Sequence, residues 1–279
     1  MSDGRTRTQK EYAQHLSFPE EHTSMTDCKT IVVTNQKGGV GKTTTCAALA
    51  GIFRSRGKRV LCIDLDPQGN LSFSLGAEDS GYTIHDAMKG SCGIAAAIKH
   101  TRVCDVISSN ILLSGSELEL TGSDREFILK KLLIPLHNIY DVIILDTPPA
   151  LSILTINAYI AANDLIIPMT PEILSLQGIA QLRDTILAVK RFYNKNLRTR
   201  GILLTKYNSR FQLSAEVAEM ASVVAGQLDT SVFDIKIPMC IAAAEAPAHG
   251  MTITEYSPRC SASREYTKLA AFLYPELCS

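Results

Sequence analysis

From residue 29 onward, short runs of apolar residues alternate with longer segments in which apolar residues recur every three or four positions. The short runs predict strands at 30–34, 59–64, 141–146, 165–168, 201–205 and 232–237. The longer segments predict helices at 43–56, 116–137, 153–162, 173–193, 213–225 and 261–273. Because the strands are apolar throughout rather than alternating, both of their faces are expected to be covered by helices.

This order of elements indicates one α/β domain over 29–279, built on a single doubly wound, mostly parallel sheet flanked by helices. The stretch 76–110 is less regular, and for it we expect two short helices and a strand. Residues 1–28 are polar without sustained periodicity, so we expect an N-terminal tail with the composition of a disordered segment.

Composition narrows the function only slightly. Lysine plus arginine and aspartate plus glutamate both number 28, so the whole-chain charge does not indicate a nucleic-acid partner, although a local basic patch would survive that average. The eight cysteines are scattered and none forms a C-x-x-C pair, which favours a reducing cytoplasm over disulfides or zinc. No run of 18 apolar residues and no signal peptide is present, so no membrane association is expected.

The segment TNQKGGVGKTTT, residues 34–45, follows a predicted strand and begins a predicted helix. In that context its glycines can aim backbone N–H groups at phosphate oxygens, and the helix N-terminus adds partial positive charge. Lys42 is expected to reach the β- and γ-phosphates, Thr43 to hold Mg²⁺ and Thr44 to contact the α-phosphate. The alternative is a chance glycine-rich turn. The loop is also unusual, since Gln36 stands where a glycine is usual and a second lysine, Lys37, follows it.

Acidic residues end two of the predicted strands, at the edge where open α/β sheets bind ligands. Asp146 follows an apolar strand as a Walker B acid does, and we expect it to hold Mg²⁺ through water; capping of the next helix is the alternative. Asp64 and Asp66 point the same way along an extended chain. One can position an attacking water while the other supports the metal, or both can be turn-forming acids before Pro67.

Together KGGVGKTT (37–44), DLDPQGN (64–70), DTPP (146–149), GILLT (201–205) and EAPAHG (245–250) resemble the ParA/Soj partition ATPases, within the group that includes MinD and nitrogenase iron protein. The resemblance runs from about residue 29 to 277. It implies a P-loop fold of the deviant Walker A type and Mg²⁺-dependent hydrolysis of ATP to ADP and phosphate.

The resemblance also implies roles for single residues. Lys37 matches the signature lysine that reaches the partner's ATP across an ATP-dependent homodimer, where a cation offsets the repulsion between two triphosphates. Asp66 matches the catalytic aspartate that positions water. The expected catalytic residues are therefore Lys37, Lys42 and Asp66; the metal-holding residues are Thr43, Asp64 and Asp146; and the nucleotide-binding residues are Lys37, Gly38, Gly39, Val40, Gly41, Lys42, Thr43, Thr44, Pro238 and Met239, the last two beside the adenine.

Family members bind double-stranded DNA without sequence specificity in the ATP state, and a ParB-like protein stimulates hydrolysis and release. The resemblance thus implies a cytoplasmic protein that is nucleoid-associated when ATP is bound. Arg210 matches one DNA-binding arginine, and Arg259 and Arg264 are plausible additions. However, the arginines of the family's typical IPRNVRLSEAP are Met239 and Ala242 here, which weakens the expectation of strong DNA binding. Other basic residues compensate only if they share the face of Arg210, and otherwise they are solvated surface charges: Lys190, Arg191, Lys195, Arg198, Arg200 and Lys206.

Two other functions stay open. One is an ATP-gated switch that positions or regulates a protein complex with weak or no DNA binding. The other is a small-molecule enzyme of the same fold, such as a ligase or reductase, although Cys92, Cys104 and Cys240 do not match the iron–sulfur ligands of the nitrogenase iron protein. The tail is too short for a helix-turn-helix domain, and the segment 268–279 lacks the basic amphipathic character of MinD's membrane helix, so neither operator binding nor membrane targeting is expected.

Overall fold

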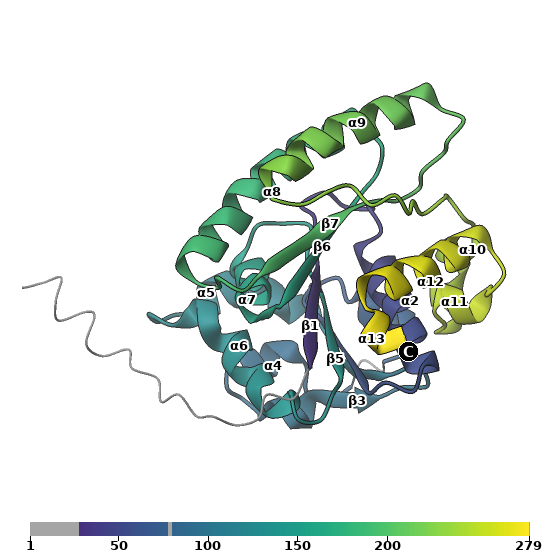
Figure 1. Cartoon of the computed structure of the whole chain (residues 1–279). Coiled ribbons are helices and arrows are strands. Elements are labelled where there is room, and N and C mark those ends of the chain that lie inside the picture. Colours follow the sequence, from purple (N-terminus) through teal and green to yellow (C-terminus); the bar gives the residue numbers. More distant parts are fainter. Residues whose placement is uncertain (1–27, 78–79, 279) are drawn as a thin grey trace, which may run out of the picture.

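The computed structural model of the protein describes residues 28–77 and 80–278, so nearly all of the predicted tail lies outside the described residues. The core of the fold is a sheet in the order β3-β4-β2-β5-β1-β6-β7, and helices lie on both sides of it (Figure 1). All neighbouring strands are parallel except β3 and β4. The predicted doubly wound, mostly parallel α/β sheet is confirmed.

Five of the six predicted strands are present, and two further strands occur at one edge of the sheet. The strands are β1 (Lys29–Val33), β2 (Val60–Asp64), β3 (Ile98–His100), β4 (Asp105–Ile107), β5 (Val142–Asp146), β6 (Asp164–Met169) and β7 (Arg198–Leu204). The longer helices are α2 (Lys42–Ser55), α7 (Ile153–Ala161), α8 (Ile173–Phe192), α9 (Gln212–Gln227) and α12 (Ser261–Leu273). The short α-helices are α3 (Asn70–Ser74), α4 (Ile84–Met88), α5 (Ser116–Glu119), α6 (Ile128–Leu133), α10 (Ala242–Glu245), α11 (Ile253–Tyr256) and α13 (Pro275–Cys278). The 3₁₀ segments are η1 (Ile94–Ala97), η2 (Ile111–Gly115), η3 (Arg125–Phe127), η4 (Ile134–Leu136) and η5 (Ala246–His249).

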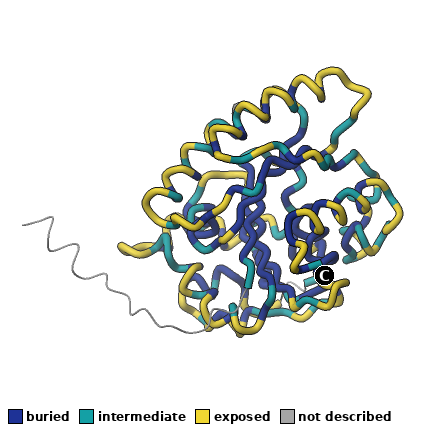
Figure 2. The backbone as a smooth tube through the Cα atoms, viewed as in Figure 1, coloured by how far each residue is buried: buried dark blue, intermediate teal, exposed yellow. Residues whose placement is uncertain are grey.

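The sheet separates two hydrophobic cores. Side chains of α2 and α12 pack on one face, and side chains of α4, α6, α7, α8 and α9 pack on the other. The strands are dark blue in Figure 2 because they are buried on both faces, whereas the outer sides of α8 and α9 are exposed. Burial on both faces explains why the strands are continuous apolar runs. Within the described residues, no helix combines the length and the apolar character needed to cross a bilayer.

The strand predicted at 232–237 is wrong. This segment runs beside β7, and its contacts with it include the backbone bonds Phe233 N–H to Ile202 O at 3.0 Å and Ile237 N–H to Leu204 O at 2.8 Å. Only isolated bridges form, at Ile202–Val232 and Tyr207–Pro238. Residues 233–237 lie against only residues 202–204 of β7, so the segment bulges away from β7 between these two bonds and no continuous ladder forms.

Two other predictions needed correction. The helix predicted over 116–137 is broken into α5, η3, α6 and η4, because Gly122 at φ +111° leaves the helical region and Pro135 interrupts its hydrogen bonds. The stretch 76–110 contains α4 and η1 as expected, but it forms two strands rather than one. The extra strand, β3, is antiparallel to β4 and too short to show a pattern in the sequence.

The strand register determines where the site forms. Asp146, the last residue of β5, lies beside Val33 at the end of β1 and beside Asp64 at the end of β2. The ends of β2 and β5, which carry the predicted acids, therefore lie at the same edge of the sheet as the loop that follows β1. This is the edge at which parallel α/β sheets bind ligands.

Candidate functional site

The loop between β1 and α2 needs glycine at two positions. Gly39 has φ +72° and Gly41, the N-cap of α2, has φ +87°, a conformation that other residues rarely adopt. A Cβ at Gly41 would lie 3.6 Å from the Thr205 side chain, whose hydroxyl donates to the Val40 carbonyl at 2.8 Å. Thr205, which directly follows β7, thus fixes the loop through this hydrogen bond. The Val40 side chain is fully buried and holds the middle of the loop against the protein.

A cavity of about 850 Å³ opens above this loop. The loop, the turn after β2 and the segment after β7 form its walls, together with the start of α12. Its lining includes Gly38, Gly39, Gly41, Lys42, Thr43, Thr44, Asp66, Gln68, Asn70, Phe73, Lys206, Pro238, Met239, Cys240, Ile241, Ala262 and Tyr266. The volume falls within the range of small-molecule sites. The predicted adenine-side residues therefore do share one cavity with the predicted phosphate loop.

Lys42 is the most buried cation of the cavity, with 7% of its surface exposed. Its ammonium donates to the Lys37 carbonyl at 3.2 Å, which directs the side chain along the loop. Burial lowers the pKa of Lys42, and the carboxylates of Asp146 and Asp66 oppose that shift. Burying a charged ammonium costs free energy unless the charge is paired, and an anion bound in the cavity would pair with it.

Thr43 and Asp146 form a short polar contact at the floor of the cavity. The Thr43 hydroxyl donates to Oδ2 of Asp146 at 2.6 Å. Oδ1 of the same carboxylate is buried and has no hydrogen-bond partner among the described residues. Burial, followed by the nearby charge of Asp64, raises the pKa of Asp146 to about 8.

These two residues fit a magnesium site. A threonine hydroxyl and a buried carboxylate oxygen without a partner are ligands, direct or through water, that Mg²⁺ takes beside nucleotide phosphates. Among the described residues, no three His, Cys, Asp or Glu side chains are grouped so that they could hold an ion by themselves. The phosphates and water would therefore supply most of the coordination.

Asp64 has a different environment from the one its predicted metal role suggests. Oδ2 accepts from the Ser72 amide and hydroxyl, each at 2.8 Å, and Oδ1 accepts from the Asp66 amide at 3.0 Å. Burial raises the pKa of Asp64 to about 6, against the effect of the hydrogen bonds from Ser72. Its oxygens organise the turn after β2, so its influence on a metal would come through its charge.

Asp66 lies on the cavity wall with 7% of its surface exposed. Its Oδ1 accepts from the Gln68 amide at 3.0 Å, which fixes the side chain in the turn. The second oxygen of the carboxylate is then available to a ligand or a water in the cavity. This is the arrangement that a water-positioning residue needs.

Lys37 does not line the cavity formed by the described residues. Its ammonium forms an ion pair with Oε2 of Glu172, just before α8, and donates to the Ser175 hydroxyl at 3.1 Å. The loop beneath it is fixed by the Lys37 amide, which donates to Asn35 Oδ1 at 2.9 Å. The two lysines of the loop thus point to different places, Lys42 into the cavity and Lys37 toward α8.

The predicted DNA-contacting arginines are all exposed. Arg210 lies in the turn before α9, where its amide donates to Asn208 Oδ1 at 3.0 Å. Arg259 precedes α12, and Arg264 lies on it. Met239, at one of the two positions where the family's typical sequence has arginine, is 72% exposed.

Several lining residues were not identified from the sequence. Tyr266 of α12 reaches the Thr45 side chain at 3.1 Å, and Phe73 of α3 lines the cavity with 66% of its surface exposed. Lys206 also lines the cavity and has φ +50°, which is rare outside glycine. Glu172 was missed as the partner of Lys37. Neither Glu172 nor Tyr266 lies in a recognisable motif, so only the fold brings them to the loop.

Comparisons with known proteins agree with this geometry. The sequence profile of a family described as an AAA domain matches residues 28–199. The chromosome-partitioning ATPase Soj of Treponema pallidum is 40% identical over 245 residues, which cover 87% of this chain and 95% of that protein. The sporulation initiation inhibitor protein Soj of Bacillus subtilis is 40% identical over 247 residues, which cover 87% of this chain and 96% of that protein.

Solved structures share the fold. A crystal structure of cobyrinic acid a,c-diamide synthase from Mycobacterium smegmatis, with a bound ATP analogue and magnesium, is 34% identical and superposes with a TM-score of 0.76. The match covers 88% of this chain and 95% of the other.

Proposed function

Since the chain belongs to the ParA/Soj family of chromosome-partitioning ATPases, we propose that it is an ATP-dependent dimerising ATPase that partitions a chromosome or plasmid. In this proposal it binds DNA non-specifically with ATP, and a ParB-like partner stimulates hydrolysis and release. The observation that carries the proposal is the division of labour between the two loop lysines. Lys42 faces the cavity of its own chain, while Lys37 is directed away from it.

The triphosphate would lie along the loop from residue 38 to 44. Backbone N–H groups of the loop and the start of α2 would bind its oxygens, and Lys42 would neutralise the charge on the β- and γ-phosphates. Thr43 and Asp146 would hold Mg²⁺, which would offset the negative charge that develops on the phosphates during hydrolysis. The adenine would then lie toward Pro238 and Met239 on the opposite wall.

Asp66 would hold the attacking water in line with the terminal phosphate. The water oxygen forms a bond to the γ-phosphorus as the bond to the β–γ bridging oxygen breaks, leaving ADP and inorganic phosphate. Asp66 is suited to orienting that water because it lines the cavity and its Oδ1 is fixed by the Gln68 amide. We expect basal turnover to be slow and to rise when a partner binds.

Lys37 would complete the site of a second copy of the chain. Its pair with Glu172 is partly exposed, with 30% and 58% of the two side chains accessible, and exposed pairs contribute only about 0–1 kcal/mol. Releasing Lys37 toward the phosphates of a second chain therefore costs little. ATP would become the centre of the dimer interface.

A second function is favoured by one observation at the rim of the cavity. Met239 and Ala242 replace the arginines typical of the family, so the phosphate contacts available to DNA are fewer. The alternative is an ATP-gated switch that positions or regulates a protein complex with weak or no DNA binding.

The deciding experiment uses Asp66→Ala, which should retain ATP and hold the dimer. Its DNA binding is measured with ATP and with ADP over a salt series. Binding that needs ATP and weakens steeply with salt supports the partition function, and Arg210→Ala in the same background should weaken it without affecting the dimer. A stable ATP dimer that ignores DNA would refute partition in favour of the ATP-gated switch. Failure to bind ATP at all would overturn both.

A further inference from the structure

A second cavity lies between the start of α7 and the C-terminal half of α8, with α5 and η3 at its sides. Its volume is about 510 Å³, within the range of ligand sites. Helix α7 contacts α5, η3 and α8, and the three α-helices are neighbours in Figure 1. We call this hollow the α7–α8 groove, after Ile153 and Ile156 of α7 and Val189 of α8, which line it.

The lining of the α7–α8 groove is largely apolar. Ile153 and Val189 are buried, while Leu151 and Tyr193 are 50% and 42% exposed. The ring of Tyr193 packs on Phe127, with the ring centroids 5.8 Å apart. An exposed leucine and a supported aromatic ring beside a hollow are the kind of surface that the apolar side chains of a partner cover.

The groove also carries an excess of negative charge. Glu117, Glu126 and Asp184 line it together with one cation, Arg125. Arg125 pairs with Glu126 at 3.4 Å, and Arg183, which lies outside the lining, pairs with Asp184 at 2.8 Å. Three carboxylates against two guanidinium groups leave one negative charge, because Glu117 has no ion pair with any residue that the structure describes. An occupant with a positive charge would complement it.

Glu117 is in addition the residue that fixes the start of α7. Its Oε1 accepts from the amide of Ile153, the first residue of α7, at 2.5 Å. Its Oε2 has no hydrogen-bond partner in the described part of the chain and can accept from an incoming cation. A basic group bound to Glu117 would therefore act on a carboxylate that positions α7.

A short segment joins the groove to the nucleotide cavity. Asp146 ends β5, Pro149 lines the nucleotide cavity, and Leu151 lines the α7–α8 groove. The Thr155 hydroxyl donates to the Ala150 carbonyl at 2.7 Å, which ties this segment to α7. A change at the start of α7 is therefore transmitted through only a few residues to the predicted magnesium site.

We propose that the α7–α8 groove docks a segment of a second protein in which a basic side chain stands beside apolar ones. The basic group would bind Glu117, and the apolar side chains would cover Leu151 and Tyr193. Occupation of the groove would shift the segment 149–151 and raise the rate of hydrolysis. Docking rests on the groove alone, whereas the effect on hydrolysis rests on the proposed function and gives its activating partner a place to act.

The chemistry of the groove favours a peptide segment over other occupants. Carboxylates repel the phosphates of DNA and of anionic lipid headgroups. A small organic cation would pair with Glu117 but would leave the apolar surface of Leu151 and Tyr193 in water. A segment that carries both kinds of side chain satisfies the charge and covers the apolar surface together.

The first test measures docking to the full chain without nucleotide. The probe is a short fluorescent peptide of alternating arginine and leucine. Two control peptides carry glutamate in place of arginine, or serine in place of leucine. Fluorescence anisotropy should show binding of the first peptide only, and hydrogen–deuterium exchange should slow within residues 149–156 and 184–193. Equal binding of the three peptides, absence of binding, or protection elsewhere would overturn the proposal.

Variants connect the binding to the groove. Glu117→Gln should weaken it about threefold to fivefold, because it removes an exposed charge while its amide oxygen can still accept from Ile153. Leu151→Ser should weaken it about fivefold or more by removing apolar contact. The matched control is Glu219→Gln, an exposed glutamate of α9 that does not line the groove. Equal losses in the two glutamine variants would reduce the binding to unspecific attraction. A change of mass in Leu151→Ser by light scattering would assign the groove to a second copy of the chain instead.

The last test measures ATP hydrolysis with saturating arginine–leucine peptide. The rate should rise at least about fivefold, the low end of common couplings between two sites. Glu219→Gln should respond in the same way, and Glu117→Gln should keep its rate without peptide but respond less. Peptide that binds without changing the rate would refute the coupling. A chain that binds the peptide and hydrolyses no ATP would refute the proposed ATPase function, while the docking stands on the first test.

Discussion

At the scale of single residues, the site is governed by charges that the fold buries before any ligand arrives. Asp146 and Asp64 are both fully buried, and Lys42 is nearly so. The carboxylates lie side by side on neighbouring strands, and the charge of Asp64 raises the pKa of Asp146 in addition to the effect of burial. A ligand that brings a divalent cation to Asp146 and an anion to Lys42 would relieve both penalties at once.

The raised pKa of Asp146 should make the stability of the unliganded protein depend on pH. Its pKa is about 8 in the fold and near 4 when exposed, so between these values the folded chain holds a proton that the unfolded chain has lost. The unliganded protein should therefore lose stability as pH rises from about 4 to 8, by at most about 1.4 kcal/mol per pH unit. Urea unfolding across this range, with Asp146→Asn as the variant that lacks the titration, checks the direction.

Binding of Mg²⁺ and nucleotide at pH 7 should release this proton, because the cation favours the ionised carboxylate. Calorimetry in buffers of different ionisation enthalpy measures the release. Asp146→Asn should abolish it, whereas Asp141→Asn should not, since Arg59 holds the pKa of Asp141 below its ordinary value. Equal proton release from wild type and Asp146→Asn would show that another group titrates.

Lys42 provides a separate prediction at the same scale. Lys42→Ala should weaken ATP binding about 10–100-fold, because a charge-assisted hydrogen bond contributes about 1.5–3 kcal/mol. The matched control is Lys268→Ala, an exposed lysine paired with Glu265 on α12. Fluorescent-nucleotide titration measures both. Unchanged affinity in Lys42→Ala would argue against phosphate binding by this loop.

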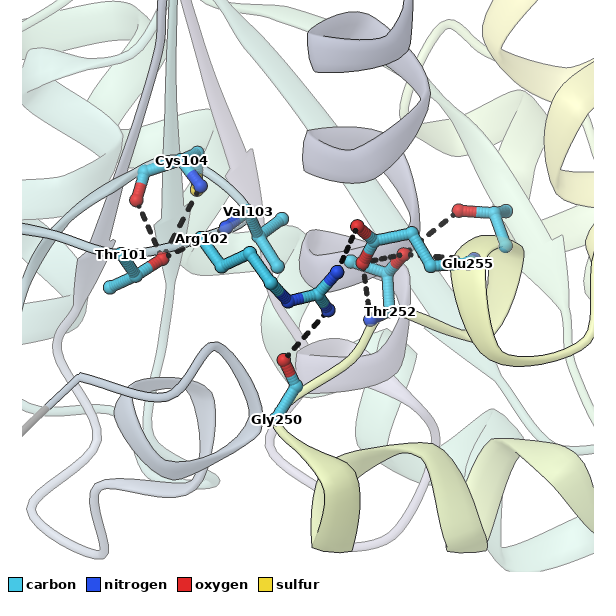
Figure 3. A network of polar contacts seen from close by, with 8 residues as sticks. Thr101, Arg102, Val103, Cys104, Gly250, Thr252 and Glu255 are labelled. Carbon is cyan, nitrogen blue, oxygen red and sulfur yellow. Dashed lines mark hydrogen bonds and ion pairs between the residues drawn. The ribbon is translucent and has the colours of Figure 1, made fainter.

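At the scale of elements, the position of the C-terminal segment depends on how α11 packs against α2. Gly51 lies in α2, and a Cβ there would come within 2.6 Å of the Thr252 hydroxyl. Thr252 and Glu255 form a capping box at the start of α11. Figure 3 shows Arg102, in the turn between β3 and β4, reaching Glu255 at 3.3 Å and the Gly250 carbonyl at 3.4 Å. The C-terminal segment is thereby fixed both to α2 and to the edge of the sheet that carries β3 and β4.

Gly51→Ala tests this contact. The added methyl group must displace α11, so we expect a loss of about 1–3 kcal/mol in the free energy of unfolding. The matched control is Gly226→Ala in α9, where a Cβ meets nothing within 4 Å, and where alanine should stabilise by about 0.5–1 kcal/mol. Urea denaturation separates the two. Equal effects of both substitutions would mean that α11 adjusts without cost.

The same scale shows what the sequence can predict. The apolar strands and the longer helices could be predicted from periodicity. A strand buried on both faces is a continuous apolar run, and a helix buried along one stripe has apolar residues every three or four positions. The segment 232–237 has an apolar pattern too, but it bonds to β7 only near its two ends, and no local pattern encodes that interruption. The Lys37–Glu172 pair joins residues 135 positions apart, so only the tertiary fold brings them together.

At the scale of the whole molecule, the question is how a single folded chain could act as a switch. The exposed apolar side chains near the cavity rim include Phe73, Met239 and Ile241, each more than 60% exposed. A second copy of the chain would cover such a rim and exclude water from the phosphates. Lys37, held by an exposed ion pair beside α8, is the cation that such an assembly would recruit.

Lys37→Ala should therefore separate binding from assembly. ATP affinity should change less than about threefold, because Lys37 does not line its own cavity. In the Asp66→Ala background, the ATP-dependent dimer should disappear from size-exclusion chromatography with light scattering. Glu172→Gln is the companion variant: it frees Lys37 at the cost of a surface pair worth about 0–1 kcal/mol, and it should leave the ATP dimer intact. If Lys37→Ala still dimerised with ATP, the lysine would serve only its contact with Glu172, and the charge that joins two ATP-bound chains would have to come from elsewhere in the fold.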